Sequence, residues 1–381
     1  MTNNLAIYIH WPFCKAKCPY CDFNSHVSEK IDQARWKDAY LKELGFYHEK
    51  HGKKQVSSIF FGGGTPSLME PALVEKVIDF ITKNWKVAND IEITLEANPT
   101  SFETKKFVGF KNAGVNRVSI GLQSLRDDNL KFLGREHSAK EAAESIVQAG
   151  NIFDNYSFDM IYALPGHTVQ AWKEELGEAL KMARHHISLY QLTIEKGTPF
   201  FKAHADGEFV LPDEDTAAEL YNVTNEMAGK AGFDTYEVSN YARAGFESKH
   251  NLNYWKHGEY VGIGPGAHGR LNNNIGTREA TTNIYNPKNW LTSVEDKSTG
   301  LQSKEPIEGE RLLEEFLIMN LRLKEGFSRQ KFIDLFAATP EEKLNLDKMI
   351  KGGFVEVGED YIRATKKGFL VLNSVISKLI L

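Results

Sequence analysis

Three cysteines are the residues with the clearest chemistry in this sequence. Cys14, Cys18 and Cys21 lie within eight consecutive residues, and the sequence has only these three. Thiolates are soft ligands that favour zinc or iron–sulfur clusters. An odd, tightly grouped set of cysteines favours a metal or redox site over a framework of disulfides. We therefore expect a metal centre near the amino terminus.

Two kinds of metal centre fit three thiolates. A structural zinc ion normally takes four protein ligands, so a zinc site would need His10, Asp22 or His26 as the fourth. A four-iron cluster is usually held by four cysteines, and three would leave one iron open to another ligand. Three buried cysteines without a metal are the remaining alternative, but Lys15 and Lys17 make this segment a poor core element. We favour the cluster.

The elements that must position the cysteines follow from an alternation of short apolar runs and helix-length amphipathic segments up to about residue 240. This pattern is typical of repeated βα units around a parallel sheet. The predicted strands are Leu5–His10, Val56–Phe61, Ile91–Glu96, Arg117–Leu122, Ser157–Ala163 and Ile187–Ile194. The predicted helices between them are Gln33–Glu49, Glu70–Trp85, Phe102–Ala113, Ala139–Ala149 and Val169–Arg184. Six strands are fewer than the eight of a closed barrel, so we predict an α/β fold with a partial (β/α)6 barrel.

Small or polar residues stand where the predicted strands end. The second strand leads into the turn Gly62–Pro66, where missing Cβ atoms let the backbone approach a small polar ligand. Side chains at the carboxyl ends of successive strands are how barrel sites are assembled from distant sequence. Each residue taken alone could equally be a cap or a turn residue. The later strand ends and the loops after them supply Glu96, Gln123, Arg135 and Asp159.

The rest of the chain divides into two further regions. We assign residues 1–240 to the barrel and 241–307 to a connecting loop region that contains His250–Trp255 (HNLNYW) and the glycine-rich Gly262–Gly269. Residues 308–381 predict helices and two short strands, as in a small α+β, winged-helix-like domain. That last region has 12 basic and 12 acidic residues, so we do not expect it to bind DNA.

The composition and net charge of the chain make some classes of function unfavourable. The chain of 381 residues is 41% hydrophobic and 25% charged, with a formal net charge of −5. These proportions are those of an ordinary globular protein, and its net negative charge does not favour binding to nucleic acid. The first residues lack the pattern of a secretory signal, and no run of 18 apolar residues occurs. We expect a cytoplasmic protein and leave peripheral contact with a membrane open.

The C-x3-C-x2-C spacing resembles that of radical S-adenosylmethionine (SAM) enzymes. In that superfamily the open iron of a [4Fe–4S] cluster binds the methionine end of SAM, and one electron from the cluster cleaves SAM to a 5′-deoxyadenosyl radical. Together with Gly62–Pro66, His250–Trp255 and Gly262–Gly269, the cysteines resemble the oxygen-independent coproporphyrinogen oxidase group and its heme chaperone branch. This implies a partial radical-SAM barrel with a small C-terminal domain.

The resemblance also implies roles for single residues. Tyr8 and Tyr20 would pack on the cofactor beside the cluster, and the turn Gly63, Gly64 and Thr65 would meet its methionine end. Four polar residues would contact the polar atoms and ribose of SAM: Glu96, Gln123, Arg135 and Asp159. Arg135 suits the methionine carboxylate, because a guanidinium can bind a carboxylate through two hydrogen bonds.

Two features separate the oxidase from the heme chaperone branch. The oxidases carry a further cysteine two positions after the third, where this chain has Phe23, and only Met1–Asn4 precede the first predicted strand. His250 lies in a pattern resembling the chaperone branch, and imidazole is a natural axial ligand for heme iron. Alternatively, His250 hydrogen-bonds loop backbone. His268 is the second candidate for heme.

The function that the resemblance implies is therefore a heme chaperone that delivers heme to respiratory hemoproteins. Its cofactors would be a [4Fe–4S] cluster, SAM and heme. An oxygen-independent coproporphyrinogen III oxidase is the alternative, and an unrelated zinc-binding module is a third. Whether the chain is an enzyme, which proteins are its clients and whether it forms a homodimer stay open.

Overall fold

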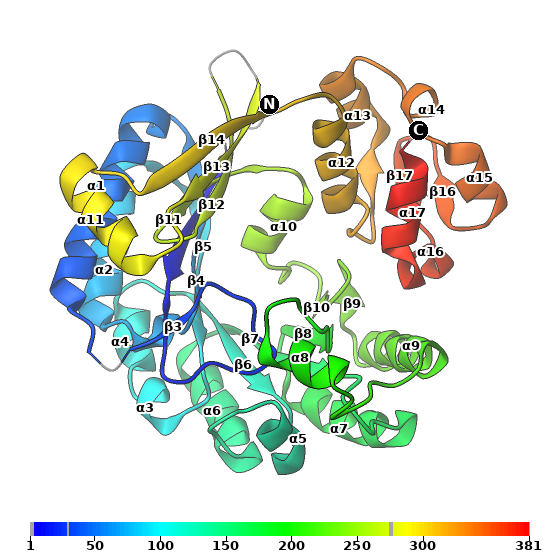
Figure 1. The fold of residues 1–381 in the computed structure, drawn as a ribbon, viewed down its shortest axis with the longest axis horizontal. Helices are drawn as coiled ribbons and strands as arrows, with labels where there is room; N and C mark the ends of the chain where they lie inside the picture. Colours follow the sequence, from blue (N-terminus) through cyan, green and yellow to red (C-terminus); the bar gives the residue numbers. More distant parts are fainter. Residues whose placement is uncertain (1–3, 29, 274–276, 381) are drawn as a thin grey trace.

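A twelve-stranded mixed sheet forms the centre of the computed structural model, which describes residues 4–28, 30–273 and 277–380 (Figure 1). Six neighbouring strands run parallel, in the order in which they occur in the sequence. They are β1 (Asn4–Trp11), β4 (Gln55–Gly63), β5 (Lys86–Ala97), β6 (Arg117–Gln123), β7 (Asn155–Tyr162) and β8 (His186–Gln191). The predicted α/β fold and its six parallel strands are confirmed.

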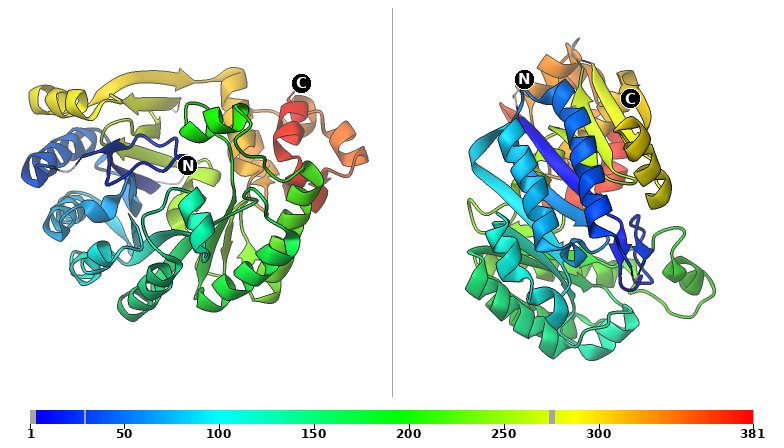
Figure 2. Two further views of the ribbon diagram at one scale, coloured as in Figure 1. Left: turned by 60° about the horizontal axis from the view of Figure 1, so that its bottom comes forward. Right: turned by 90° about the vertical axis from the view of Figure 1, so that its left-hand side faces the viewer.

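Helices cover the outer face of these strands (Figures 1 and 2). The longer ones are α1 (Gln33–His51), α2 (Pro71–Asn84), α6 (Ala139–Ile152) and α7 (Val169–Met182), and the short ones are η1 (Pro66–Leu68), α3 (Ser101–Thr104), α4 (Phe107–Asn112) and α5 (Asp127–Phe132). In α6, Ser138 and Glu141 form a reciprocal capping box that fixes where the helix begins. The buried residues of α6 recur at helical spacing and form a single face toward the sheet.

The region 241–307, predicted as connecting loops, instead extends the sheet at both ends. Its elements are β10 (Asn240–Ala242), α10 (Lys249–Trp255), β11 (Glu259–Ile263), β12 (His268–Asn272) and β13 (Arg278–Asn283), followed by α11 (Pro287–Lys297) and β14 (Leu301–Ile307). β11 pairs in parallel with β1, and β12, β13 and β14 follow antiparallel. The prediction of a loop region was wrong because these strands contain Gly, Asn, Ala and Glu, which depress β-propensity without preventing pairing.

The stretch between β8 and β10 was also underpredicted. It holds α8 (Pro199–Ala205), α9 (Glu214–Lys230) and β9 (Asp234–Thr235). The side chain of Asp213 accepts a hydrogen bond from the Thr216 N–H and caps α9. Such a cap followed by acidic residues is a helix-start signal, although Pro212 directly before it favours a turn.

Residues 309–379 form a second, smaller body with its own apolar core (Figure 1). A three-stranded antiparallel sheet in the order β15-β17-β16 carries helices on its flanks. The elements are α12 (Gly309–Asn320), β15 (Phe327–Ser328), α13 (Arg329–Phe336), α14 (Pro340–Lys343), α15 (Leu346–Lys351), β16 (Val355–Val357), β17 (Tyr361–Ala364), α16 (Lys366–Leu370) and α17 (Leu372–Leu379). The predicted small α+β domain is confirmed. None of the described helices is long and apolar enough to cross a bilayer.

Candidate cofactor site

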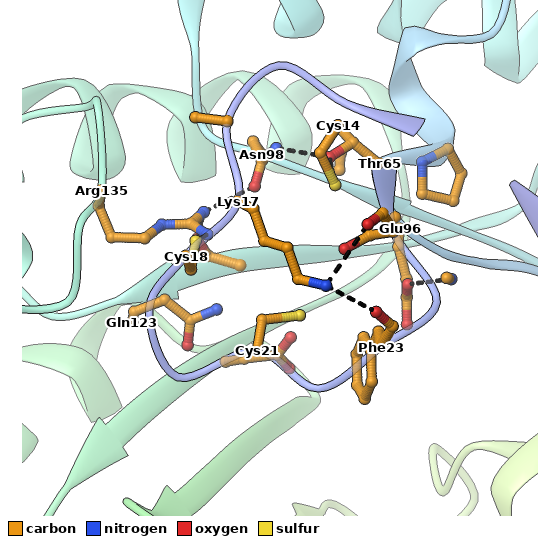
Figure 3. Close-up of a pocket in the computed structure, with 18 of the residues that line it drawn as sticks. Cys14, Lys17, Cys18, Cys21, Phe23, Thr65, Glu96, Asn98, Gln123 and Arg135 are labelled. Carbon is orange, nitrogen blue, oxygen red and sulfur yellow. Dashed lines mark hydrogen bonds between the residues drawn. The ribbon is translucent and has the colours of Figure 1, made fainter. Parts of the chain in front are cut away.

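The cysteine loop follows β1 directly and is framed by a small parallel pair, β2 (Phe13–Cys14) and β3 (His26–Val27). Cys14, Cys18 and Cys21 are all half-buried and line one cavity (Figure 3). Burial raises the pKa of the Cys14 and Cys21 thiols. A positively charged metal centre would therefore be needed to hold these sulfurs as thiolates at neutral pH.

The structure brings most of the sequence-predicted site residues to the same cavity. The carboxyl ends of parallel strands share one edge of the sheet, so residues distant in sequence meet there. The predicted residues that line the cavity with the cysteines are Tyr20, Gly63, Gly64, Thr65, Glu96, Gln123, Arg135 and Asp159. Their roles toward a cofactor stay predictions.

The glycine turn after β4 lies against the cysteine loop. The Gly64 N–H donates to the Trp11 carbonyl at 2.7 Å, and the Thr65 N–H donates to the Phe13 carbonyl at 2.8 Å. A Cβ atom on Gly64 would lie 2.6 Å from the Phe13 oxygen, which is too close for any side chain. Gly63 has a φ of 113°, a conformation that favours glycine. Both glycines are thus required by the backbone geometry.

Two half-buried carboxylates, Glu96 and Asp159, line the cavity. Burial and the neighbouring Asp159 raise the pKa of Glu96 to about 8, although the Gly63 N–H donates to Glu96 at 3.2 Å. Burial likewise raises the pKa of Asp159 to about 6, against hydrogen bonds from Ser188 and Ser119. Two such groups close together favour a cation between or beside them. These carboxylates therefore suit a positively charged ligand group.

The guanidinium of Arg135 also lines the cavity. Its Nη2 donates to Asn98 Oδ1 at 2.6 Å and to the Gly121 carbonyl at 2.8 Å, and its Nη1 donates to Cys18 Sγ at 3.3 Å. Gln123 has a φ of 74°, in the left-handed region that non-glycine residues seldom adopt. Such strain persists where the surrounding structure imposes it, frequently at functional sites.

Asn98 is a cavity residue that the sequence reasoning missed. It lines the cavity, accepts from Arg135 and donates from Nδ2 to Thr65 Oγ1 at 3.2 Å. Asn98 follows Glu96 by two residues at the end of β5, and successive side chains of a strand alternate between faces. The alternation was the available signal, because Glu96 was already a predicted site residue.

Tyr8 and Tyr20 differ in their positions. Tyr20 lines the cavity and packs against Phe200, with ring centroids 6.3 Å apart. Tyr8 does not belong to the cavity lining; its hydroxyl is hydrogen-bonded to His10 Nδ1 at 3.0 Å. The His10 ring in turn lies against Gly63. Tyr8 therefore supports the glycine turn through His10, and its packing on the cofactor stays a prediction.

His250 lies in the core, away from the cavity. Its side chain is 1% exposed, with Nδ1 bonded to Ser58 Oγ at 2.9 Å and Nε2 bonded to the Tyr254 hydroxyl at 2.7 Å. Burial lowers the pKa of His250 to about 3. Both ring nitrogens have side-chain partners in this structure, and the expectation that His250 binds heme stays a prediction. His268, the second candidate, is exposed and contacts Thr282 Oγ1 at 3.3 Å.

The donor set fits a cluster better than a single ion. Within the described ranges no three or more His, Cys, Asp or Glu side chains are grouped so that they could hold one metal ion. Two of the side chains considered as a fourth zinc ligand have other partners, since His10 Nε2 bonds the Asn24 carbonyl and His26 Nε2 bonds Asn24 Oδ1. Three thiols spread around one cavity suit a multi-iron cluster with one open corner.

Comparisons with known proteins identify the family. Residues 8–179 match the Radical SAM superfamily and residues 307–371 match the HemN C-terminal domain. The chain is 35% identical to "Heme chaperone HemW" of Escherichia coli K12 over 376 residues (98% of this chain, 97% of that protein). It is 33% identical to "Heme chaperone HemW" of Bacillus subtilis over 374 residues (97% of each). It is also 38% identical to "Radical S-adenosyl methionine domain-containing protein 1, mitochondrial" of Bos taurus over 392 residues (100% and 88%).

A solved structure shows the same fold. The radical SAM enzyme coproporphyrinogen III oxidase (HemN) from Escherichia coli superimposes with a TM-score of 0.80, covering 99% of this chain and 90% of the oxidase. At 20% sequence identity this likeness establishes the architecture alone. The HemW relatives are similar over nearly their whole length. The chain therefore belongs to the HemW family of radical SAM proteins.

Proposed function

We propose that this protein holds a [4Fe–4S] cluster through Cys14, Cys18 and Cys21, with SAM bound beside it in the same cavity. The proposal is supported by three half-buried thiols that line one cavity and by membership of the radical SAM superfamily. When bound, the cluster supplies single electrons, and SAM is the molecule that they cleave in this superfamily. The protein's own residues orient SAM and exclude water around it.

The cavity offers complementary groups to the charged methionine end of SAM. Glu96, once ionised, pairs with the ammonium, and Arg135 pairs with the carboxylate through its donor fork. Backbone groups of Gly63 and Gly64 lie close enough to the cavity to bind polar atoms, because no Cβ intervenes. Asp159 and Gln123 are the groups left for the ribose hydroxyls. The cavity thus offers groups of both signs, as a zwitterion requires.

We further propose that the protein binds heme in the cytoplasm and delivers it to respiratory hemoproteins. The observation that carries this proposal is similarity over 97% of the length of two proteins named heme chaperones. Phe23 supports it: where the resembled oxidases have a cysteine, this side chain lines the cavity and is 57% exposed. An exposed aromatic ring provides an apolar surface in place of a fourth sulfur ligand.

Heme binding and cofactor content can be tested on one anaerobically reconstituted sample. Iron and sulfide analysis should give a four-iron cluster, and titration with hemin should give a saturable Soret band. The Cys18→Ala variant is the matched control that separates heme binding from cluster assembly. Absence of saturable hemin binding with and without the cluster would overturn the chaperone proposal. Conversion of coproporphyrinogen III to protoporphyrinogen IX by the same sample with SAM and reductant would assign the oxidase activity instead.

A further inference from the structure

A continuous run of hydrogen bonds joins two of the three cysteines through side chains outside the cysteine loop (Figure 3). Arg135 Nη1 donates to Cys18 Sγ at 3.3 Å, and Arg135 Nη2 donates to Asn98 Oδ1 at 2.6 Å. Asn98 Nδ2 then donates to Thr65 Oγ1 at 3.2 Å, and Thr65 Oγ1 donates to Cys14 Sγ at 3.3 Å. We call these three side chains, Arg135, Asn98 and Thr65, the sulfur relay.

The chemistry of the three side chains fixes the direction of every bond. A guanidinium has donors only, so the Asn98 atom that faces Arg135 must be the carbonyl oxygen. The amide nitrogen of Asn98 consequently faces Thr65 and donates to its hydroxyl oxygen. A Cys14 sulfur that ligates the cluster carries no hydrogen, so the single hydroxyl hydrogen of Thr65 is directed to that sulfur. Asn98 therefore orients a donor toward each of the two sulfurs.

We infer that Asn98 is a positioning residue that raises the reduction potential of the cluster by holding Thr65 and Arg135 as hydrogen-bond donors to Cys14 and Cys18. The inference rests on the cluster ligation proposed above. Reduction adds one negative charge to the cluster, and donors to its sulfurs stabilise that charge. Hydrogen bonds to the sulfurs are among the factors that set iron–sulfur potentials, and residues behind the ligands tune metal sites in the same way.

Two substitutions test the relay at different bonds. Thr65→Val keeps the shape of the side chain and removes the hydroxyl that donates to Cys14. Asn98→Asp keeps the oxygen that accepts from Arg135, but its second oxygen accepts the Thr65 hydrogen and draws it away from Cys14. Both variants should lower the midpoint potential of the cluster in an anaerobic redox titration followed by electron paramagnetic resonance, at unchanged iron and sulfide content.

Thr94→Val is the matched control. Thr94 lies on β5, the strand that ends beside Asn98, is 0% exposed, and its hydroxyl has no hydrogen-bond partner within the residues that the structure describes. This substitution makes the same chemical change as Thr65→Val without touching the relay. The cluster potential of Thr94→Val should equal that of the wild type, and a Thr65→Val potential equal to that of Thr94→Val would overturn the inference.

A double variant separates the relay from the charge that aspartate adds. The new charge acts through space in any background, whereas the relay effect of Asn98→Asp needs the Thr65 hydroxyl. Asn98→Asp should therefore lower the potential less in the Thr65→Val background than in the wild type. Equal shifts in the two backgrounds would contradict the positioning role. A wild-type sample without iron would instead overturn the proposed function itself, so the two failures are distinguishable.

Discussion

The backbone N–H of Gly63 donates a hydrogen bond of 3.2 Å to Glu96 and joins the end of β4 to the end of β5. This single donor does not offset the burial and the neighbouring Asp159, which together raise the pKa of Glu96 to about 8. At pH 7 the carboxyl group of the free protein therefore holds its proton. Binding of the SAM ammonium requires the ionised form, so the proton must be released first.

The affinity for SAM should consequently rise with pH. Between pH 7 and pH 8.5 the ionised fraction of a group with this pKa increases roughly eightfold. The ratio of wild-type affinity to that of Glu96→Gln, measured by calorimetry on reconstituted protein, should increase by a similar factor. The ratio cancels the titration of SAM itself, because both proteins meet the same ligand. A ratio that is constant over this range would refute the role assigned to Glu96.

Gly64→Ala should impair assembly of the cluster. The new methyl group would lie 2.6 Å from the Phe13 oxygen, so either the glycine turn or the cysteine loop must move. Overpacking of this kind costs about 1–3 kcal/mol. The iron content after reconstitution and the free energy of unfolding, measured by urea denaturation, should both be lower than in the wild type. Gly229→Ala is the control, since a Cβ atom there meets nothing within 4 Å; equal losses in both variants would contradict the steric explanation.

The parallel half of the fold was predictable because its strands carry dense apolar runs. β4 and β7 are buried along most of their length, and buried strands read as continuous hydrophobic segments. β12 and β14 were not predictable in the same way. β14 exposes most of its residues at the edge of the sheet, where polar side chains are tolerated. Its place in the sheet is decided by pairing with β13, which local sequence does not encode.

Site residues on predicted strands could be found from the sequence. Residues whose role depends on hydrogen-bond partners elsewhere in the chain were harder to predict. Glu96 was found because it ends a predicted strand, and Asp159 because it is a carboxylate within one. Asn98 was missed because its importance comes from Arg135 and Thr65, which are distant in sequence. The partners of His250 were equally hidden, because Ser58 on β4 bonds one of its ring nitrogens. Chemical type alone does not reveal whether a polar group already has partners.

Glu43→Gln should destabilise the whole barrel. The Glu43 carboxylate is 0% exposed and accepts hydrogen bonds from donors that lie between the end of β11 and the start of β14. These donors are the Gly264 and Gly300 N–H groups, Asn283 Nδ2 and Trp290 Nε1. A glutamine amide would direct its own N–H groups at some of these donors, at a cost of about 2–4 kcal/mol. Urea denaturation measures the loss. Glu49→Gln, at an exposed position of α1, should leave stability unchanged.

The same carboxylate predicts a pH dependence of stability. Burial raises the pKa of Glu43 to about 7 in the folded protein, above its ordinary value of 4.5. The folded state then binds more protons than the unfolded state between these two values. This contribution to stability is complete below pH 4.5 and is lost as the pH rises through 7. The difference in unfolding free energy between wild type and Glu43→Gln should change across that window, and a constant difference would contradict the assignment.

Glu315→Gln should loosen the smaller body from the sheet. Glu315 lies on α12, and its carboxylate accepts from Arg270 Nε at 2.6 Å and from Arg278 Nε at 2.9 Å. Arg270 is on β12 and Arg278 is on β13 of the large sheet. The three side chains are between 6% and 20% exposed, so the pairs are shielded from solvent. Removing the charge leaves two poorly solvated guanidinium groups and should cost about 2 kcal/mol at this contact. Hydrogen exchange of the α12 amides should accelerate, while exchange in β4 and β5 should not. The neighbouring Glu314→Gln is the control because Glu314 is exposed; acceleration in both variants would show that helix charge, and not the contact with Arg270 and Arg278, protects α12.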